Sequence, residues 1–273
     1  MPDAPGPGPS RPAPGTDPPA PSRPALSPDA LDALVCPHCG GALTRAEHAL
    51  RCPRGHSFDV ARQGYVALER RPARGDTADM VAARERFLAA GHYAPIAAAL
   101  VEAAPPARTI VDLGCGTGYY LAALLDARPD ARGIGLDASR PALRRAARAH
   151  PKITAVACDI WDALPLADGA ADLMLNVFAP RNVPEIRRVL AGTLLVVTPT
   201  ERHLRELDLI GVHPRKQERL HDALGAPRAE RLLEYELTLA DAADLVAMGP
   251  SAHHDLGART GGRVTVSVRI ETY

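Results

Sequence analysis

Apolar runs alternate with helical stretches from Thr109 onward, and this alternation restricts the possible folds more than any other feature of the sequence. The runs are apolar throughout, which is typical of parallel strands that helices cover on both faces. They occupy Thr109–Leu113, Gly133–Leu136, Thr154–Cys158, Asp172–Phe178 and Thr193–Thr198, and the helical stretches occupy Tyr119–Ala127, Ser139–Ala149 and Val183–Leu190. Two later segments alternate apolar and polar residues as a closing antiparallel hairpin would, Leu232–Leu239 and Arg263–Thr272. The sequence therefore predicts an open α/β sheet of seven strands, with its ligand at the carboxyl ends of the strands.

The chain ahead of this sheet divides into three segments. Residues 1–28 hold eleven of the 27 prolines, and a stretch so rich in Pro, Ala, Gly and Ser predicts a disordered tail. Residues 31–70 form a compact module with three of the five cysteines. Residues 71–105 predict a helical linker, in which Asp76 or Thr77 caps a first helix that ends near Gly91. A second helix follows over Pro95–Glu102, and residues 106–273 form the α/β domain.

Composition excludes some classes of protein. Thirty-two Lys and Arg balance 32 Asp and Glu, so the net charge alone does not indicate a nucleic-acid binder. The sequence shows neither a run of about 18 apolar residues nor a signal-peptide pattern. We therefore expect a cytoplasmic protein with no membrane partner.

Two short-spaced pairs of metal-binding residues lie in the N-terminal module. Cys36-Pro-His-Cys39 is followed, after twelve residues, by Cys52-Pro-Arg-Gly-His56. Zinc takes four thiolate or imidazole ligands at tetrahedral corners, and two such pairs on tight turns supply them. A module this small has too thin a core to fold without the metal. We predict structural Zn²⁺; unrelated free thiols are the alternative, and a disulfide does not suit a cytoplasmic chain.

A glycine-rich loop, Asp112-Leu-Gly-Cys-Gly-Thr-Gly-Tyr119, follows the first strand of the α/β domain and opens a helix. Its glycines let the backbone turn sharply and let a ligand approach closely: Gly114, Gly116 and Gly118. Asp137 ends the second strand, where a carboxylate can bind both hydroxyls of a ribose. Asp159 follows the third strand, where a carboxylate can lie near an adenine amino group. This order of parts resembles the class I S-adenosylmethionine (SAM)-dependent methyltransferases, which have a Rossmann-like mixed sheet.

The fourth strand ends in Asn176-Val-Phe-Ala-Pro-Arg181. Enzymes that methylate exocyclic amines of adenine or cytosine usually carry Asn/Asp-Pro-Pro-aromatic at this point, so such an amine is a poor candidate acceptor. With the zinc pairs and the glycine loop, the chain resembles the bacterial 23S rRNA guanine-N1 methyltransferases from about Val35 to the C-terminus. Further motifs carry this resemblance: Phe58–Val66, Asp79–Arg84, Gly91–Pro95, Pro184–Arg188 and Val246–Pro250.

The resemblance implies methyl transfer from SAM to N1 of a guanine in a 23S rRNA hairpin. The Asn176–Arg181 motif is similar to the tylosin-resistance branch, which modifies position 748, so macrolide resistance is an expected consequence; position 745 is the alternative. The resemblance also implies a homodimer that holds one hairpin. It further implies that four residues contact SAM: Tyr93, Gly116, Thr117 and His203.

Two departures from the family's pattern bear on activity. Relatives carry Pro-Gly-Gly before the fifth strand, whereas Leu190–Thr193 makes a shorter turn, and the region Leu209–Arg231 looks trimmed. We expect both changes to fall near the acceptor face.

The reaction itself suggests two catalytic candidates. N1 of guanine must lose a proton, which leaves charge on O6. We hypothesise that Arg181 or a nearby backbone N–H stabilises this charge, and Asn176 is a further catalytic candidate. No carboxylate can be assigned from the sequence as the base that removes the proton.

Arginines gather in the N-terminal module and the start of its linker: Arg45, Arg51, Arg54, Arg62, Arg70, Arg71 and Arg74. Because Lys and Arg neutralise phosphates, we interpret residues 31–70 as an RNA-recognition module. The group Arg144, Arg145 and Arg148 is better explained as a solvated helix face. Two other functions stay open: a methyltransferase for a small molecule, with the module as a lid, and a zinc-ribbon RNA-binding protein whose SAM site has decayed.

Overall fold

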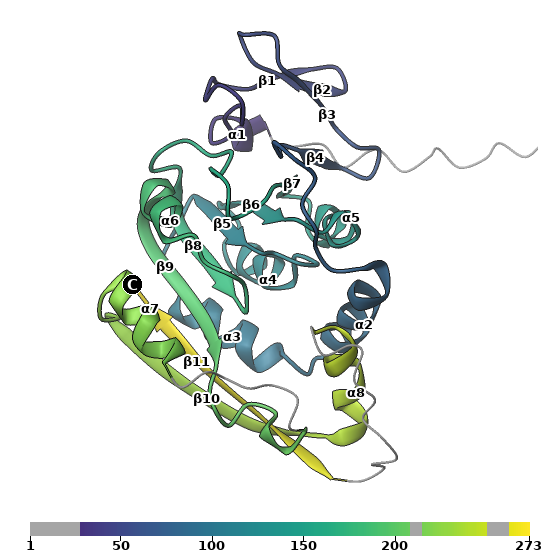
Figure 1. The fold of residues 1–273 in the computed structure, drawn as a ribbon, viewed down its shortest axis with the longest axis vertical. Helices are drawn as coiled ribbons and strands as arrows, with labels where there is room; N and C mark the ends of the chain where they lie inside the picture. The colour runs from purple at the N-terminus through teal and green to yellow at the C-terminus, as the bar shows by residue number, and fades with distance from the viewer. Residues whose placement is uncertain (1–27, 208–214, 250–261) are drawn as a thin grey trace, which may run out of the picture.

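The computed structural model describes residues 28–207, 215–249 and 262–273. The predicted disordered tail therefore lies outside the described residues, apart from Pro28. Eight strands form the main sheet in the order β10-β11-β9-β8-β5-β6-β7-β4 (Figure 1). Their bounds are β4 (Tyr65–Ala67), β5 (Thr109–Leu113), β6 (Arg132–Asp137), β7 (Ile153–Ala157), β8 (Ala171–Val177), β9 (Leu190–Pro199), β10 (Ala229–Thr238) and β11 (Arg263–Thr272). The seven predicted strands are confirmed, and β4 adds an eighth.

The sheet is mixed, as the sequence predicts. The strands from β4 to β9 pair in parallel, whereas β11 runs antiparallel to both β9 and β10. The pairing of β10 with β11 confirms the closing hairpin. Its connection differs from a simple turn, because α8 (Leu239–Ala247) lies between the two strands. The eight residues that begin at Leu239 have an apolar stripe at helical spacing, which buries Leu239, Ala242, Leu245 and Val246.

Helices cover both faces of the sheet. One face packs against α2 (Ala78–Ala89), α3 (Ala94–Ala103), α4 (Tyr119–Ala127), α5 (Arg140–Ala149) and α8. The other packs against α1 (Pro28–Leu31), α6 (Val183–Val189) and α7 (Lys216–Leu224). Successive residues of β8, and likewise of β9, point alternately into the two helical layers. Because both layers are apolar, both strands are apolar throughout.

The helical linker forms as the sequence predicts. Thr77 is the N-cap of α2, and its hydroxyl accepts a hydrogen bond from the Met80 N–H at 3.3 Å. Ala90 caps the other end, one residue before Gly91. α2 lies beside α8, to which it is joined by an ion pair between Arg86 and Asp244 (Figure 1). No helix in the described ranges has the length and apolar character that a bilayer span requires.

The N-terminal module packs directly on the α/β domain. Three short antiparallel strands form its sheet: β1 (Thr44–Ala46), β2 (Ala49–Arg51) and β3 (Ser57–Asp59). Its next strand, β4, leaves this sheet and pairs with β7 as the edge strand of the main sheet. Val35 also donates to the Pro165 carbonyl at 3.1 Å, and Leu34 and Leu166 are both buried. The module and the α/β domain therefore share one hydrophobic core.

The shortened turn at Leu190–Thr193 lies elsewhere than expected. α6 passes straight into β9, whose first residue, Leu190, is also the C-cap of the helix. The other end of β9, at Pro199, is the end that lies on the side of the sheet where the ligand cavity opens. A strand rises about 3.3 Å per residue, so the two ends are roughly 20 Å or more apart. The expectation that this change falls near the acceptor face is therefore wrong.

Candidate active site and zinc centre

Four potential zinc ligands meet in the N-terminal module. One ligand atom from each of Cys36, Cys39, Cys52 and His56 lies within 4.8 Å of all the others. The Cys39 and Cys52 sulfurs are 3.6 Å apart, and His56 Nδ1 is 3.4 Å from the Cys36 sulfur and 3.3 Å from the Cys52 sulfur. Tetrahedral Zn²⁺ with bonds of about 2.0–2.3 Å has ligand separations of this size. The four predicted residues therefore fit a zinc ion.

The turns that carry these ligands are held by backbone hydrogen bonds. Gly40 donates to the Cys36 carbonyl at 2.8 Å, and Gly55 donates to the Cys52 carbonyl at 3.0 Å. Burial acts to raise the pKa of Cys52, but hydrogen bonds with His56, Arg54 and Cys39 together outweigh it and lower the pKa to about 6. A thiol with this pKa is largely ionised at neutral pH, the form that binds zinc.

A cavity of about 900 Å³ opens at the carboxyl ends of the central parallel strands. This volume lies within the range of small-molecule sites. Residues that follow four neighbouring strands line it: Gly114 after β5, Asp137 at the end of β6, Asp159 after β7 and Phe178 after β8. Seven predicted SAM-site residues line this cavity: Tyr93, Gly114, Gly116, Thr117, Asp137, Asp159 and His203. The other two, Asp112 and Gly118, belong to the glycine loop but do not line the cavity.

Asp137 holds the glycine loop in place. Its two carboxylate oxygens accept hydrogen bonds from the N–H groups of Gly116 at 2.8 Å and Ser139 at 2.7 Å. Gly116 has a positive φ of 53°, and a Cβ there would approach the Arg84 guanidinium to 3.3 Å. The loop therefore needs glycine at this position, both for its backbone conformation and for the space in front of it.

Asp112 is buried beneath the loop without a partner. It is 1% exposed, and neither carboxylate oxygen makes a hydrogen bond. Burial, and then the charge of Asp137, raises the pKa of Asp112 to about 8. Gly118, the last glycine of the loop, is the N-cap of α4. A Cβ on Gly118 would meet the backbone of α5 at 3.0 Å, so this glycine serves helix packing.

Asp159 and Trp161 form the far side of the cavity, after β7. An Asp159 oxygen accepts a hydrogen bond from the Trp161 N–H at 2.9 Å. The indole of Trp161 lines the cavity and is 64% exposed. It is the single tryptophan of the chain. No motif in the sequence marks Trp161 as a site residue, although its position two residues after Asp159 is a usable signal.

Arg84 and Asp76 form a second feature that the sequence analysis did not assign to the site. They make an ion pair at 2.5 Å, and Arg84 also donates to the Met248 carbonyl at 3.1 Å. All three residues line the cavity. Arg84 thus joins the linker, the glycine loop and the end of α8. Its place in the motif Asp79–Arg84 was visible in the sequence, but its partners are distant in the chain.

Three rings meet on the side of the cavity near β8 and β9. The centroid of Phe178 lies 5.7 Å from that of Tyr93 and 6.2 Å from that of His203, whose ring is within 21° of parallel. Burial lowers the pKa of His203 to about 4, so the ring is neutral at pH 7. Its Nδ1 accepts a hydrogen bond from the Ser267 N–H at 3.2 Å, and the neutral ring therefore carries its proton at Nε2.

Arg181 also lines the cavity, whereas Asn176 does not. Arg181 Nε is buried without a partner, and burial lowers the pKa of the guanidinium despite the nearby Tyr273 and Glu271. Asn176 is fully buried, and its amide donates to the Pro180 carbonyl at 2.9 Å. A direct catalytic contact by Asn176 does not fit this placement. Its geometry suits a positioning residue that holds the loop carrying Pro180 and Arg181.

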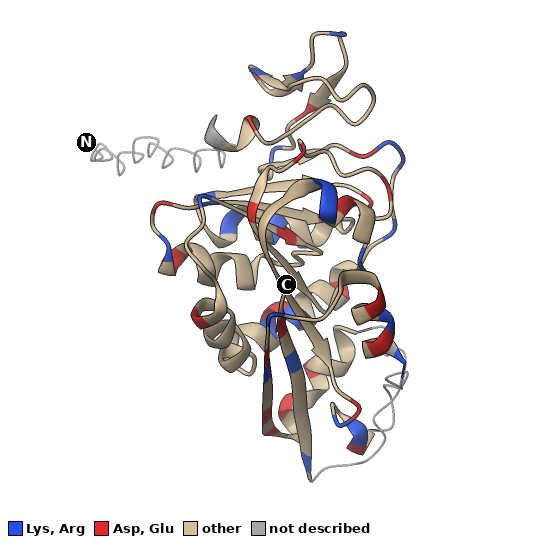
Figure 2. Ribbon diagram, turned by 90° about the vertical axis from the view of Figure 1, so that its left-hand side faces the viewer, with Lys and Arg blue, Asp and Glu red and all other residues tan. Residues whose placement is uncertain are grey.

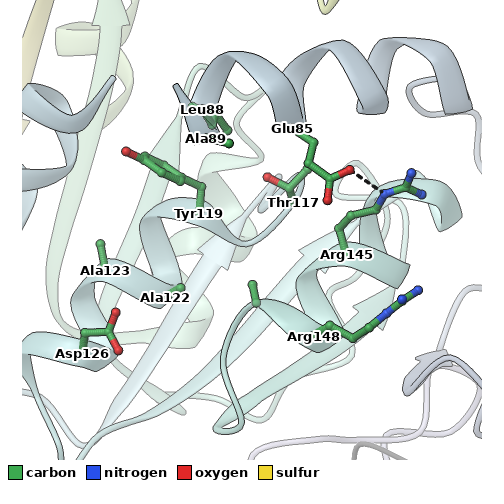
Figure 3. Close-up of a pocket in the computed structure, with 11 residues that line it drawn as sticks. Glu85, Leu88, Ala89, Thr117, Tyr119, Ala122, Ala123, Asp126, Arg145 and Arg148 are labelled. Atoms are coloured by element: carbon green, nitrogen blue, oxygen red, sulfur yellow. Dashed lines mark hydrogen bonds and ion pairs between the residues drawn. The ribbon is translucent and has the colours of Figure 1, made fainter. Parts of the chain in front are cut away.

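A second, shallower hollow lies between α2, α4 and α5 (Figure 3). Thr117 and Tyr119 line both this hollow and the main cavity. Its two arginines come from α5, and Glu85 pairs with Arg145 at 3.4 Å. Asp126 adds a second acid, so the charges of the hollow balance. This agrees with the interpretation of the Arg144, Arg145 and Arg148 group as a helix face.

The arginines of the N-terminal module and the start of its linker, from Arg45 to Arg74, are all exposed. Between residues 31 and 75 seven arginines stand against four acidic residues, and Figure 2 shows basic segments on the hairpins of the module. Arg70, the last residue of the module, donates to the Pro37 carbonyl at 2.8 Å, which ties the end of the module to its first cysteine pair. Arg74 lines the main cavity, so this basic surface extends from the module to the cavity mouth.

The residues of the cavity fit SAM. The unpartnered Asp112 carboxylate suits a ligand that brings positive charge close to the loop. The space in front of Gly116 and the carboxylates of Asp137 and Asp159 suit a nucleoside that crosses the ends of β6 and β7. Cys115 and Cys158 are buried, and burial raises the pKa of both thiols, so neither has the character of a nucleophile.

Two family models match the chain. A family described as a methyltransferase domain matches residues 110–200. A zinc-ribbon family, described as the N-terminal part of RlmA, matches residues 34–69. Fold, cavity and metal centre together define a class I SAM-dependent methyltransferase with an N-terminal zinc ribbon.

Two relatives show the family, and a third matches over a shorter part of the chain. A protein of Micromonospora griseorubida assigned as a 23S rRNA (guanine-N1)-methyltransferase is 49% identical over 91% of this chain and 99% of its own length. The 23S rRNA (guanine(748)-N1)-methyltransferase of Streptomyces fradiae is 50% identical over 81% of this chain and 86% of its own. A Bacillus subtilis protein assigned to the same activity without a position is 33% identical over 63% of this chain and 66% of its own. The chain belongs to the 23S rRNA (guanine-N1)-methyltransferase family.

Proposed function

We propose that this enzyme transfers the methyl group of SAM to N1 of a guanine in 23S rRNA, at position 748. The observation that carries the proposal is a single cavity that joins the glycine loop to Arg181 and a set of aromatic rings, in a chain 50% identical to the position-748 enzyme of S. fradiae. Macrolide resistance of a cell that contains the modified rRNA is the proposed consequence.

The SAM contacts are assigned to the residues that line the cavity on its β5–β7 side. Asp137 and Asp159 would bind the ribose hydroxyls and the adenine amino group, and the backbone of Gly116 and Thr117 would lie against the ligand. When bound, SAM supplies a methyl group on a sulfonium, which is already a good electrophile. The enzyme's main contribution is therefore alignment of the acceptor nitrogen with that methyl group.

Arg181 is assigned to the charge that develops on the guanine. Loss of the N1 proton places negative charge on O6, and a fixed cation in a desolvated cavity stabilises such charge strongly. Arg181 lines the cavity, and its Nε makes no hydrogen bond with the described residues. Asn176 would act on the reaction indirectly, because its hydrogen bond to Pro180 fixes the loop. His203 would offer a neutral N–H donor rather than a base, because its Nε2 already carries the proton.

The zinc ribbon and linker are assigned to RNA binding. Exposed arginines continue from the module to Arg74 at the cavity mouth, which would let phosphates of a hairpin be neutralised while one base enters the cavity. The methyl-accepting nitrogen lies on the Watson–Crick edge of guanine, so the base must be unpaired or flipped out. The proposed partner is a 23S rRNA hairpin, held by a homodimer whose mass can be measured by analytical ultracentrifugation.

The experiment that tests this function measures methyl transfer from labelled SAM to unmodified 23S rRNA and maps the product by reverse transcription. N1 methylation blocks Watson–Crick pairing, so we expect one strong stop at position 748. A stop at 745 would keep the reaction and overturn the position. SAM binding without transfer to RNA would instead support a small-molecule methyltransferase, and absence of SAM binding would support a decayed site.

A further inference from the structure

Phe178 is an exposed aromatic residue where the fold does not require one. It follows β8 directly and is 38% exposed, and its exposed part faces the main cavity. Among the described residues, only Trp161, Phe178 and Leu232 are large apolar side chains with this degree of exposure. Two of these three line the same cavity, so the exposure is concentrated at the active site.

The backbone of Phe178 has a strained conformation. Its φ is +54°, in the left-handed region that bulky side chains avoid. The strain is held by the surroundings, since the Phe178 N–H donates to the Val197 carbonyl at 3.1 Å and Asn176 ties down Pro180. A glycine would adopt this conformation freely. A strained aromatic at a ligand site indicates a functional demand on the side chain.

The neighbours of Phe178 make a rigid aromatic wall. Tyr93 is 2% exposed and packs edge-on against Phe87 with centroids 4.8 Å apart, so it cannot swing away easily. The nearly parallel His203 is 4% exposed and is held by Ser267. The wall therefore presents the Phe178 ring to the cavity in one orientation, which suits stacking against a planar ring.

The sheet order separates this wall from the SAM side. Asp137 and Asp159 follow β6 and β7, on one side of the glycine loop after β5. Phe178 and His203 follow β8 and β9, on the opposite side. A ligand that spans the ends of β5, β6 and β7 leaves the end of β8 for the methyl acceptor.

We infer that Phe178 is the platform on which the target guanine stacks once it has left its RNA helix. This inference rests on the proposed function and deepens it. Stacking on Phe178 holds the plane of the base, and Arg181, three residues further along the same loop, approaches the edge that carries O6. Stacking of a base on an aromatic ring contributes about 1–3 kcal/mol, which corresponds to roughly 5- to 150-fold in binding or rate.

The test compares Phe178→Leu, which keeps an apolar side chain without a ring, with Phe178→Trp, which keeps an aromatic ring. We expect Phe178→Leu to lower kcat/KM for a 23S rRNA hairpin by about 5- to 150-fold, while Trp161 fluorescence reports unchanged SAM affinity. Phe178→Trp should retain most of the activity. Leu232→Ala, which changes an exposed apolar residue away from the cavity, is the matched control and should leave both values unchanged.

Phe178→Gly separates loss of function from loss of fold. This variant relieves the positive φ, which offsets part of the packing lost with the ring. It should therefore melt cooperatively at a temperature no lower than that of Phe178→Leu, while its activity falls with that of Phe178→Leu. A hairpin with 2-aminopurine in place of the target guanine gives a direct readout, because stacking quenches its fluorescence. The complex with Phe178→Leu should be brighter than the complex with the wild type.

Two results would overturn the inference. Activity of Phe178→Leu within twofold of the wild type, or equal quenching of 2-aminopurine by both proteins, would show that the ring does not hold the base. A parallel loss of SAM affinity would place Phe178 in the cofactor site instead. Failure of the wild type itself to methylate the hairpin is a different outcome, which contradicts the proposed function before any variant is compared.

Discussion

The zinc ribbon and the active-site cavity differ in whether their buried polar groups have partners. In the ribbon, four soft ligands gather within 4.8 Å of one another, so that a single ion can satisfy all of them. Around the cavity, the Asp112 carboxylate and Nε of Arg181 are buried and have no hydrogen-bond partner among the described residues. Leaving such groups unpaired costs stability. The ribbon thus uses a ligand to complete its fold, whereas the cavity relies on the rest of the domain for stability and keeps unpaired groups for its ligands.

The largest effect is expected from loss of zinc. Cys52→Ala removes one of four ligands, and zinc contributes about 10–16 kcal/mol to folding in zinc-finger peptides, more than three strands of three residues can replace. Amide hydrogen exchange should show loss of protection in β1–β3 and retained protection in β5–β9. Methylation of RNA should be abolished, while Trp161 fluorescence should still report SAM binding.

Cys158→Ala is the matched control for the zinc experiment, because Cys158 is buried like Cys52 but is not one of the four ligands. It should keep one equivalent of zinc and full protection in β1–β3. If the zinc-free protein also kept this protection, the contrast between ribbon and cavity would be wrong.

Arg181→Ala should produce the next largest effect. Removal of one donor to a developing oxyanion lowers kcat by about 10²–10³-fold in other enzymes, and we expect a similar loss here with no change in SAM affinity. Arg181→Lys should recover part of the rate, because it restores the charge without the planar guanidinium. Single-turnover methylation and Trp161 fluorescence titration measure the two quantities separately.

Arg187→Ala is the control for this experiment. Arg187 is exposed on α6 and donates to the Ala223 carbonyl outside the cavity, so both quantities should stay at wild-type values. Equal losses of turnover and SAM affinity in Arg181→Ala would assign Arg181 to cofactor binding instead of charge stabilisation.

Much of this architecture follows from local sequence patterns. Strands that are apolar throughout, with three helices between them, were sufficient to predict a parallel sheet with a closing antiparallel hairpin, and the cysteine spacing indicated the four residues that meet in the zinc ribbon. These features depend on residues close in the chain, where periodicity and spacing act directly. The same holds for the glycine loop and for Asp137 and Asp159, because strand ends of a parallel sheet meet at one edge.

The remaining features depend on distant residues. β4 has only three residues and becomes part of the main sheet through pairing with β7, about ninety positions away. The hydrogen bond from Arg84 to Met248 spans 164 positions, and no local sequence pattern predicts it. The position of Leu190–Thr193 was misjudged because a sequence does not show which end of a strand faces the ligand until the direction of every strand is known.

The raised pKa of Asp112 predicts that SAM affinity depends on pH. Burial raises the pKa of Asp112 to about 8, so at pH 7 the free protein holds a proton there that a positively charged ligand would displace. Isothermal titration calorimetry in two buffers of different ionisation enthalpy should therefore detect proton release. SAM affinity should rise from pH 6 to pH 8, by at most about tenfold per pH unit for one proton.

The stability of the free protein should change with pH in the direction opposite to SAM affinity. Because the folded pKa is raised, Asp112 lowers the stability of the free protein progressively as pH rises from about 4, its range in the unfolded chain, to about 8. Asp112→Asn should remove this part of the pH dependence and reduce proton release. Asp137, whose pKa burial also raises, remains in both proteins, so the difference isolates Asp112. Asp130→Asn, an exposed control, should behave as the wild type; if Asp112→Asn did so too, Asp112 would not be the coupled group.

The smallest effect concerns the path of the RNA between ribbon and cavity. Arg74 lies at the cavity mouth and Arg148 lines the balanced hollow of Figure 3, and both are exposed. If phosphates follow the basic surface of the ribbon, Arg74→Ala should reduce the slope of log K against log salt concentration by about one. Arg148→Ala should leave the slope unchanged, and neither variant should alter SAM affinity. A reduced slope for Arg148→Ala alone would move the RNA from the ribbon side to the α5 side, and the ribbon would then act on the enzyme only through their shared core.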